Sequence, residues 1–117
     1  MLSFLRSKSR RSAQAAPKSG AKGARAYAIG DVHGRLDLLG DLIEKIRADN
    51  EARPPAKTWL IMLGDLIDRG PDSRGVIDLF LNAPPAFDRV VMLMGNHEEM
   101  LLRALSGEPE LIPKWLT

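Results

Sequence analysis

The sequence predicts an α/β fold in which a largely parallel sheet is flanked by helices. After residue 25, a short apolar run is followed by a loop that opens with glycine and then by a helical pattern, and this order occurs three times. Strands that alternate with helices in this way form right-handed βαβ units. Ligands bind at the carboxyl ends of the strands in such sheets, so we expect the functional residues in the three loops.

The first unit begins with a short apolar run at residues 27–29, which predicts a strand that stops at Gly30. Apolar residues then recur every three or four positions from Leu36 to Ile46, with charged residues between them. This spacing predicts an amphipathic helix that covers the sheet. Two prolines at residues 54–55 end the pattern.

The second and third units follow the same plan. Residues 58–63 are a continuous apolar run, which is typical of a strand buried on both faces. After a loop, Asp72 or Ser73 is suited to cap a helix that runs to about Asn82. We expect the third strand at residues 90–94 and the third helix at residues 97–105.

The charge distribution divides the chain into a basic tail, residues 1–25, and one domain, residues 26–117. The tail holds seven of the 17 Lys and Arg residues and no acidic residue, whereas the rest holds ten basic and fifteen acidic residues. With few apolar side chains to bury, the tail is expected to be disordered, although its composition also resembles an organelle transit peptide. A basic tail on an acidic domain argues against specific nucleic-acid binding.

Composition excludes several other classes of protein. A chain of 117 residues suits one domain, and the absence of cysteine excludes disulfides, zinc-thiolate sites and thiol nucleophiles. No apolar run approaches the roughly 18 residues of a membrane span, and the N-terminus lacks the apolar stretch of a secretory signal. We therefore expect a cytoplasmic protein without a membrane span, and composition does not indicate its oligomeric state.

Each predicted strand ends in a loop that opens with glycine and then presents polar side chains. If the strands are neighbours, these loops meet at one edge of the sheet and form a cleft. The polar residues that the loops would bring together are Asp31, His33, Asp65, Asp68, Arg69, Asn96 and His97. One Gly-Asp pair is ordinary turn chemistry, but three such loops in the same position favour a metal site.

The donor types in these loops suit a pair of divalent cations. Asp31 and His33 are two residues apart, so their side chains leave an extended loop on the same side and can bind one ion. Asp65 has two oxygens with which to bridge both ions, and Asn96 offers a neutral oxygen to the second ion and to the substrate phosphate. Nitrogen and oxygen ligands without sulfur suit Mn²⁺, which we expect, or Fe or Zn²⁺.

The remaining residues suit the chemistry of phosphoester hydrolysis. His97 is expected to be the general acid for the leaving alkoxide, with Asp68 accepting the other ring proton. Arg69 offers a planar fork of donors to phosphate oxygens. The nucleophile would be a hydroxide generated by the metals, so no nucleophilic side chain is required. Glu98 and Glu99 are interpreted as helix-start residues, with a place near the cleft as the alternative for Glu98.

The strings at residues 30–34, 64–70 and 95–98 resemble, in this order, the three N-terminal signatures of the calcineurin-like metallophosphoesterases. Within that family the chain is most similar to the bacterial and phage-type serine/threonine protein phosphatases. The resemblance extends from residue 26 to about residue 105. It implies the same roles for the metal ligands, for His97 with Asp68, and for Arg69.

The resemblance implies hydrolysis of phosphomonoesters, with a phosphorylated protein or a small phosphoester as the substrate. One alternative is a symmetrical dinucleoside polyphosphate hydrolase that acts on diadenosine tetraphosphate. Such enzymes tend to lack an acid at the position of Asp68 and to carry Asp in place of Glu98, which favours a phosphatase. The other alternative is a non-catalytic module that binds a metal or a partner.

The chain departs from the family pattern after the third helix. The family's site is completed by later histidines and a second arginine, but no histidine follows His97 here. We therefore expect an N-terminal part of the domain, apparently truncated. In it, only Asp65 and Asn96 would hold the second metal, so the activity of the 117 residues alone is left open.

Overall fold

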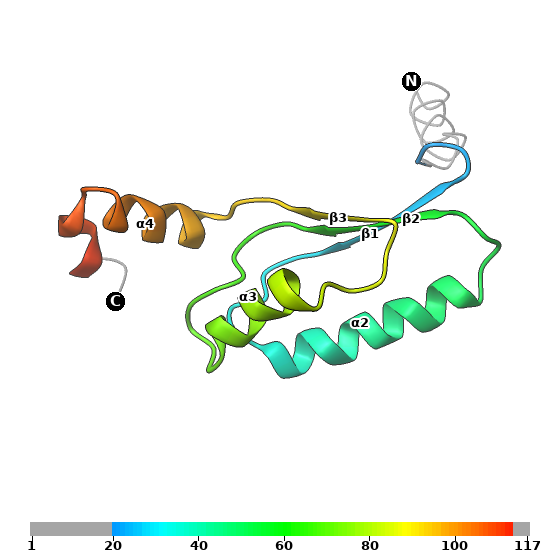
Figure 1. Cartoon of the computed structure of the whole chain (residues 1–117), viewed down its shortest axis with the longest axis horizontal. Helices are drawn as coiled ribbons and strands as arrows, with labels where there is room; N and C mark the ends of the chain where they lie inside the picture. The colour runs from blue at the N-terminus through cyan, green and yellow to red at the C-terminus, as the bar shows by residue number, and fades with distance from the viewer. Residues whose placement is uncertain (1–19, 114–117) are drawn as a thin grey trace, which may run out of the picture.

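The computed structural model of the chain describes residues 20–113 and shows alternating strands and helices (Figure 1). The elements are β1 (Ala24–Ile29), α2 (Leu36–Glu51), β2 (Lys57–Met62), α3 (Ser73–Asn82), β3 (Arg89–Met92), α4 (Asn96–Leu105) and a short 3₁₀ helix η1 (Pro109–Leu111). The strands form one parallel sheet in the order β1-β2-β3. This confirms the predicted α/β fold. Most of the predicted disordered tail lies outside the described residues.

The register of the sheet brings the ends of all three strands to the same level. Ile29 is paired with Met62, and Met62 is paired with Met92. The ladder continues one residue further, because Leu63 N–H donates to Ile29 C=O and Leu93 N–H donates to Met62 C=O, both at 2.9 Å. The three loops that carry polar residues therefore start at one edge of the sheet.

Both crossover helices lie on the same side of the sheet. Right-handed connections between strands that follow each other in sequence place α2 and α3 on one face, as Figure 1 shows. Leu60 and Met62 on that face are fully buried, whereas Trp59 and Ile61 on the other face are half-buried. The prediction that the second strand is buried on both faces is therefore wrong, because the helices of residues 20–113 that pack on the sheet cover one face.

The apolar core between the sheet and the two helices continues into the loops. Leu39 of α2, Leu60 of β2 and Val76 of α3 are 2% exposed or less. The same cluster includes Val32 in the first loop and Ile67 in the second, which are 7% and 3% exposed. Burial of such a side chain stabilises the fold by roughly 1.5–3 kcal/mol. Apolar anchors therefore alternate with the polar residues of these loops.

The first strand is longer than predicted and begins inside the segment assigned to the basic tail. Ala24 and Arg25 belong to β1 and pair with β2. The Arg25 guanidinium donates to Asn50 Oδ1 and to the Pro54 carbonyl, both at 2.6 Å. These bonds join β1 to the far end of α2, so the described domain begins before residue 26.

A second polar contact joins β1 to the same end of α2. Tyr27 Oη donates to Asp49 Oδ2 at 2.7 Å, and Arg53 donates to both oxygens of that carboxylate. Hydrogen bonds from Arg53, and secondly from Tyr27, lower the pKa of Asp49 to about 2. The carboxylate stays ionised at neutral pH and fixes where α2 ends.

The last part of the described chain leads away from the sheet. The third strand ends at Met92, two residues earlier than predicted, and α4 extends beyond the edge of the sheet (Figure 1). Leu102 and Leu105 of α4 are 49% and 74% exposed. The hydrogen bonds between α4 and the second loop are therefore made by residues at the start of the helix, His97 and Glu98.

In the described part of the chain, no helix has the length and apolar character needed to cross a bilayer. The longest, α2, has 16 residues, whereas a span requires about 20, and charged side chains line its outer face. The cytoplasmic location stays a prediction.

Candidate metal centre

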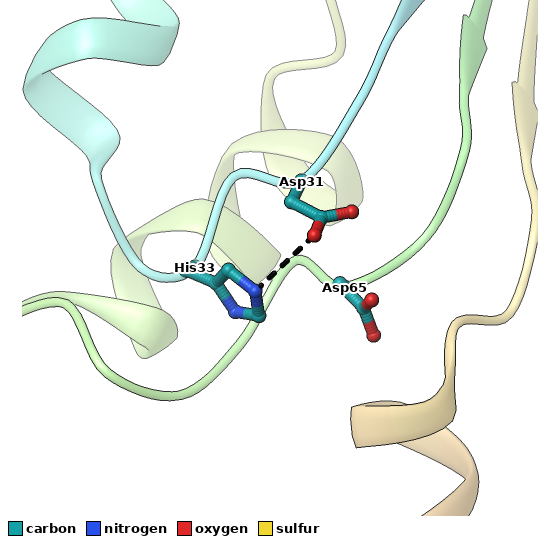
Figure 2. A group of neighbouring side chains, drawn as sticks. All are labelled: Asp31, His33 and Asp65. Carbon is teal, nitrogen blue, oxygen red and sulfur yellow. Dashed lines mark ion pairs between the residues drawn. The ribbon is translucent and has the colours of Figure 1, made fainter.

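The loop after β1 directs an imidazole nitrogen and a carboxylate toward the same point (Figure 2). His33 Nδ1 lies 2.9 Å from the Ile67 carbonyl oxygen, which can only accept, so Nδ1 carries the proton. In the neutral ring, the lone pair then lies on Nε2, which is 3.5 Å from Asp31 Oδ2. A histidine whose second ring nitrogen donates to a carbonyl is oriented as metal-binding histidines usually are.

Asp65, in the loop after β2, completes a three-residue cluster with this pair. One ligand atom from each of Asp31, His33 and Asp65 lies within 4.8 Å of the others. Figure 2 shows the Asp31 carboxylate facing the His33 ring, with Asp65 beside this pair on the neighbouring loop. Tetrahedral ligand atoms at about 2.1 Å from a cation lie about 3.4 Å apart, so these three atoms would approach one another by up to about 1.4 Å to bind one ion.

Main-chain hydrogen bonds hold the first and second loops together. The N–H groups of Val32 and His33 both donate to the Asp65 carbonyl at 3.0 Å, and Gly34 N–H donates to the Leu66 carbonyl at 2.8 Å. Gly70 approaches the first loop so closely that a Cβ there would overlap the His33 carbonyl oxygen. The relative position of the two loops is therefore set by the protein itself.

Four non-glycine residues of the described chain have positive φ angles, and all four are predicted site residues. They are His33 (47°), Asp65 (53°), Asp68 (73°) and Arg69 (74°). This left-handed conformation costs about 1–2 kcal/mol per residue. Such strain persists where surrounding contacts impose it, and it is concentrated at functional sites.

The loop after β3 meets the other two at Asp65. Asp65 Oδ1 accepts from His97 N–H at 3.0 Å. Asn96 lies against the same carboxylate and, with its amide nitrogen facing Asp65, donates to Oδ1 and Oδ2 at 2.9 and 3.0 Å. As a metal ligand, Asn96 would present its oxygen instead. The structure thus brings Asp31, Asp65 and Asn96 together.

His97 forms a close pair with Asp68 beside this cluster. His97 Nδ1 lies 2.9 Å from Asp68 Oδ2, and the two side chains are 18% and 20% exposed. The ring of His97 meets that of His33 edge to face, with centroids 4.8 Å apart. When Nδ1 donates to Asp68, the Nε2 atom of His97 remains available for proton transfer.

Arg69 is the most exposed of the residues in the second loop that we assigned to the site. Its left-handed backbone follows that of Asp68, and its side chain lies on the surface of the loop. The predicted contact with phosphate oxygens stays a prediction.

Glu98 is a site residue that the sequence led us to interpret first as a helix-start residue, with a place near the cleft as the alternative. It does accept from Gly95 N–H at 2.9 Å at the start of α4. It also accepts from Asp65, Leu66 and Ile67 N–H in the second loop. A Glu three residues into a helix signals a cap, but nothing in the sequence relates it to a loop some thirty residues earlier.

Together, a parallel α/β sheet and a cluster of acidic and imidazole side chains at the carboxyl ends of its strands define a candidate metal centre, of the kind that metal-dependent hydrolases use. Residues 24–116 match the calcineurin-like phosphoesterases, so the chain belongs to that family, as predicted. Calcineurin-like phosphoesterases use divalent metals, and the cluster of Asp31, His33 and Asp65 is the candidate centre for them.

The relatives include two kinds of phosphoesterase. Serine/threonine-protein phosphatase 1 of Salmonella typhimurium is 33% identical over 90 residues, which cover 77% of this chain and 36% of that protein. Symmetrical bis(5'-nucleosyl)-tetraphosphatases of Dechloromonas aromatica and Serratia proteamaculans are 37% and 38% identical, over 69% and 75% of this chain. The chain spans 26% and 28% of the lengths of these two proteins. It therefore covers only about a quarter to a third of the three relatives named here.

We predict that Gly95→Ala separates the second and third loops. A Cβ at Gly95 would overlap the backbone nitrogen and the carboxylate of Asp65, whereas a Cβ at Gly40, within α2, meets nothing within 4 Å. Gly95→Ala should lower the free energy of unfolding by about 1–3 kcal/mol, as overpacking does. The control Gly40→Ala should raise it by up to about 1 kcal/mol. Urea denaturation of both variants measures these changes, and an unaltered Gly95→Ala protein would contradict the close approach.

We predict that Asp65→Asn weakens Mn²⁺ binding by at least about tenfold, which corresponds to about 1.4 kcal/mol. A hard cation loses a charged oxygen ligand, while the amide oxygen can still accept from His97 N–H. Asp41→Asn, an exposed acid on α2, is the matched control for the loss of one negative charge. Isothermal titration calorimetry with Mn²⁺ measures the affinity, and equal affinities in the two variants would argue against a metal at Asp65.

Proposed function

We propose that the protein is a metal-dependent phosphomonoesterase whose substrates are protein phosphoserine and phosphothreonine. The observation that carries the proposal is the His97–Asp68 pair, at 2.9 Å, beside the cluster of Asp31, His33 and Asp65. Membership of the calcineurin-like phosphoesterases and the similarity to a serine/threonine-protein phosphatase support it.

In this proposal the chain's own residues bind the cations and hold the substrate. Asp31, His33 and Asp65 would hold one cation, and Asp65 with Asn96 would hold a second. Mn²⁺ fits these ligands, as Fe and Zn²⁺ also do. Divalent cations supply Lewis acidity, which polarises phosphoryl oxygens and lowers the pKa of a water molecule. Arg69, exposed at the rim, offers its guanidinium to the phosphate.

His97 is the proposed proton donor to the leaving alkoxide. The Asp68 carboxylate accepts the Nδ1 proton and so fixes the orientation of the ring, and low exposure of both side chains limits competition from water. A proton on Nε2 then faces outward from this pair. The left-handed backbone of Asp68, with its N–H donating to Ser73 Oγ at 3.0 Å, holds the carboxylate in place.

Symmetrical hydrolysis of dinucleoside tetraphosphates is the second candidate function. Two tetraphosphatases that are 37% and 38% identical to this chain favour it. The family resemblance favours the phosphatase, because it implies that symmetrical tetraphosphatases tend to lack the acid at Asp68 and to carry Asp in place of Glu98. Both activities would use the same metal ligands, so they would differ in the leaving group and in the residues around the metals that contact the substrate.

We predict that the general-acid pair matters most for substrates with poor leaving groups. In the protein encoded by the whole reading frame that contains this chain, His97→Asn should lower kcat for a phosphoserine peptide by about 10²–10⁴-fold. The loss should be much smaller with p-nitrophenyl phosphate, because p-nitrophenolate leaves without a proton. Asp68→Asn should show the same selectivity, and Asp41→Asn should match the wild type. Equal losses on both substrates would remove His97 as the acid.

A direct comparison of substrates separates the two candidate functions. With Mn²⁺ present, kcat/KM for phosphoserine and phosphothreonine peptides is expected to exceed that for diadenosine tetraphosphate. Steady-state assays of phosphate release and of nucleotide products measure the two values. A higher kcat/KM for the dinucleotide would replace the proposed function with the second candidate.

A further inference from the structure

The Glu98 side chain binds the main chain of two different loops. Its Oε1 atom accepts from Gly95 N–H at 2.9 Å and from Asp65 N–H at 2.7 Å. Its Oε2 atom accepts from Leu66 N–H at 2.9 Å and from Ile67 N–H at 3.3 Å. An ionised carboxylate has about four acceptor positions and no donor. All of them are used here, on backbone donors.

A capping role accounts for only one of these four bonds. In a helix cap, a Glu at the third helical position accepts from the N–H of the residue before the helix, here Gly95. The other three donors are consecutive residues of the loop after β2. With Asp65 in a left-handed conformation, their N–H groups converge on one point and form the kind of concave site that binds an anion. Glu98 supplies that anion from within the chain.

The same three loop residues pass the constraint on to the first loop through their carbonyl groups. The Asp65 carbonyl accepts from His33 N–H, and the Ile67 carbonyl accepts from His33 Nδ1–H. Glu98 therefore holds the Leu66 N–H, which belongs to the same peptide unit as the Asp65 carbonyl that binds the His33 backbone. Glu98 also holds the N–H of Ile67, the residue whose carbonyl orients the His33 ring. In return, Asp65 Oδ1 accepts from His97 N–H, next to Glu98.

We propose that Glu98 is a positioning residue of the metal centre. By binding four backbone N–H groups, it holds the strained loop at Asp65 and sets the directions of Asp65 and His33, so that metal affinity depends on it. This inference rests on the proposed metal site. It assigns Glu98 no contact with the cation or with the substrate, and it goes beyond the helix cap.

Glutamine at position 98 is the sharpest test of this role. Glu98→Gln keeps the size of the side chain, but its amide nitrogen would face N–H donors and accept from none of them. Glu99→Gln is the matched control, because Glu99 is the neighbouring acid on α4 and is exposed. Both variants remove one negative charge from the same helix turn, so the control accounts for the change in net charge.

The experiment measures Mn²⁺ affinity by isothermal titration calorimetry and amide chemical shifts by NMR, with the 117-residue chain. We expect Glu98→Gln to weaken Mn²⁺ binding by about 10–100-fold, the usual cost of losing a group that orients metal ligands. The amide protons of Asp65, Leu66 and Ile67 should shift upfield as they lose a charged acceptor. Glu99→Gln should change neither measurement.

Each other outcome has a definite meaning. If folded Glu98→Gln binds Mn²⁺ like the wild type, even with a lower melting temperature, Glu98 only stabilises the fold and the proposal is overturned. If the wild-type chain binds no Mn²⁺, the metal site fails first and this role fails with it. If Glu98→Gln does not fold, hydrogen exchange in the wild type decides: protected amides at residues 65–67 support the role, and unprotected ones overturn it.

Discussion

The hydrogen bonds around Asp65 are the constraint on which the rest of the site depends. Its carbonyl accepts from Val32 and His33 in the first loop, its carboxylate accepts from His97 in the third, and its own N–H donates to Glu98. One residue thus joins all three loops through both main chain and side chain. Because these bonds require φ near 53° at a residue with a Cβ, local preference opposes them and the neighbouring loops must impose them.

The parallel sheet makes this arrangement possible. Since the paired residues Ile29, Met62 and Met92 end the strands at one level, each following loop begins beside its neighbour. Buried residues within the loops, such as Val32 and Ile67, anchor them to the core beneath, and the polar side chains between these anchors are left at the edge of the sheet. Acids and imidazoles are thereby held close together before any cation binds, which lowers the cost of ordering them.

The same topology leaves one face of the sheet thinly covered. Sequential right-handed crossovers put α2 and α3 on one side, so Trp59 and Ile61 on the other side are half-buried. Large apolar side chains near the loops, including Leu63, Leu93 and Met94, are 49% to 63% exposed. Within residues 20–113, the sheet beneath the site is therefore packed on one face. The positions of the site residues depend on hydrogen bonds between the loops more than on a thick apolar core.

Local pattern was enough to predict the α/β fold, the amphipathic helix from Leu36 and a cap at Asp72 or Ser73. The structure has Asp72 as the cap, where it accepts from Gly75 N–H. The spacing of Gly, Asp and His after each strand was also enough to propose which residues share a cleft, because parallel strands end at one edge. The tertiary structure alone decided that the sheet is covered on one face, that four site residues adopt left-handed backbone, and that Glu98 binds the loop after β2. These features depend on contacts between segments some thirty residues apart, and periodicity and propensity describe only near neighbours in the chain.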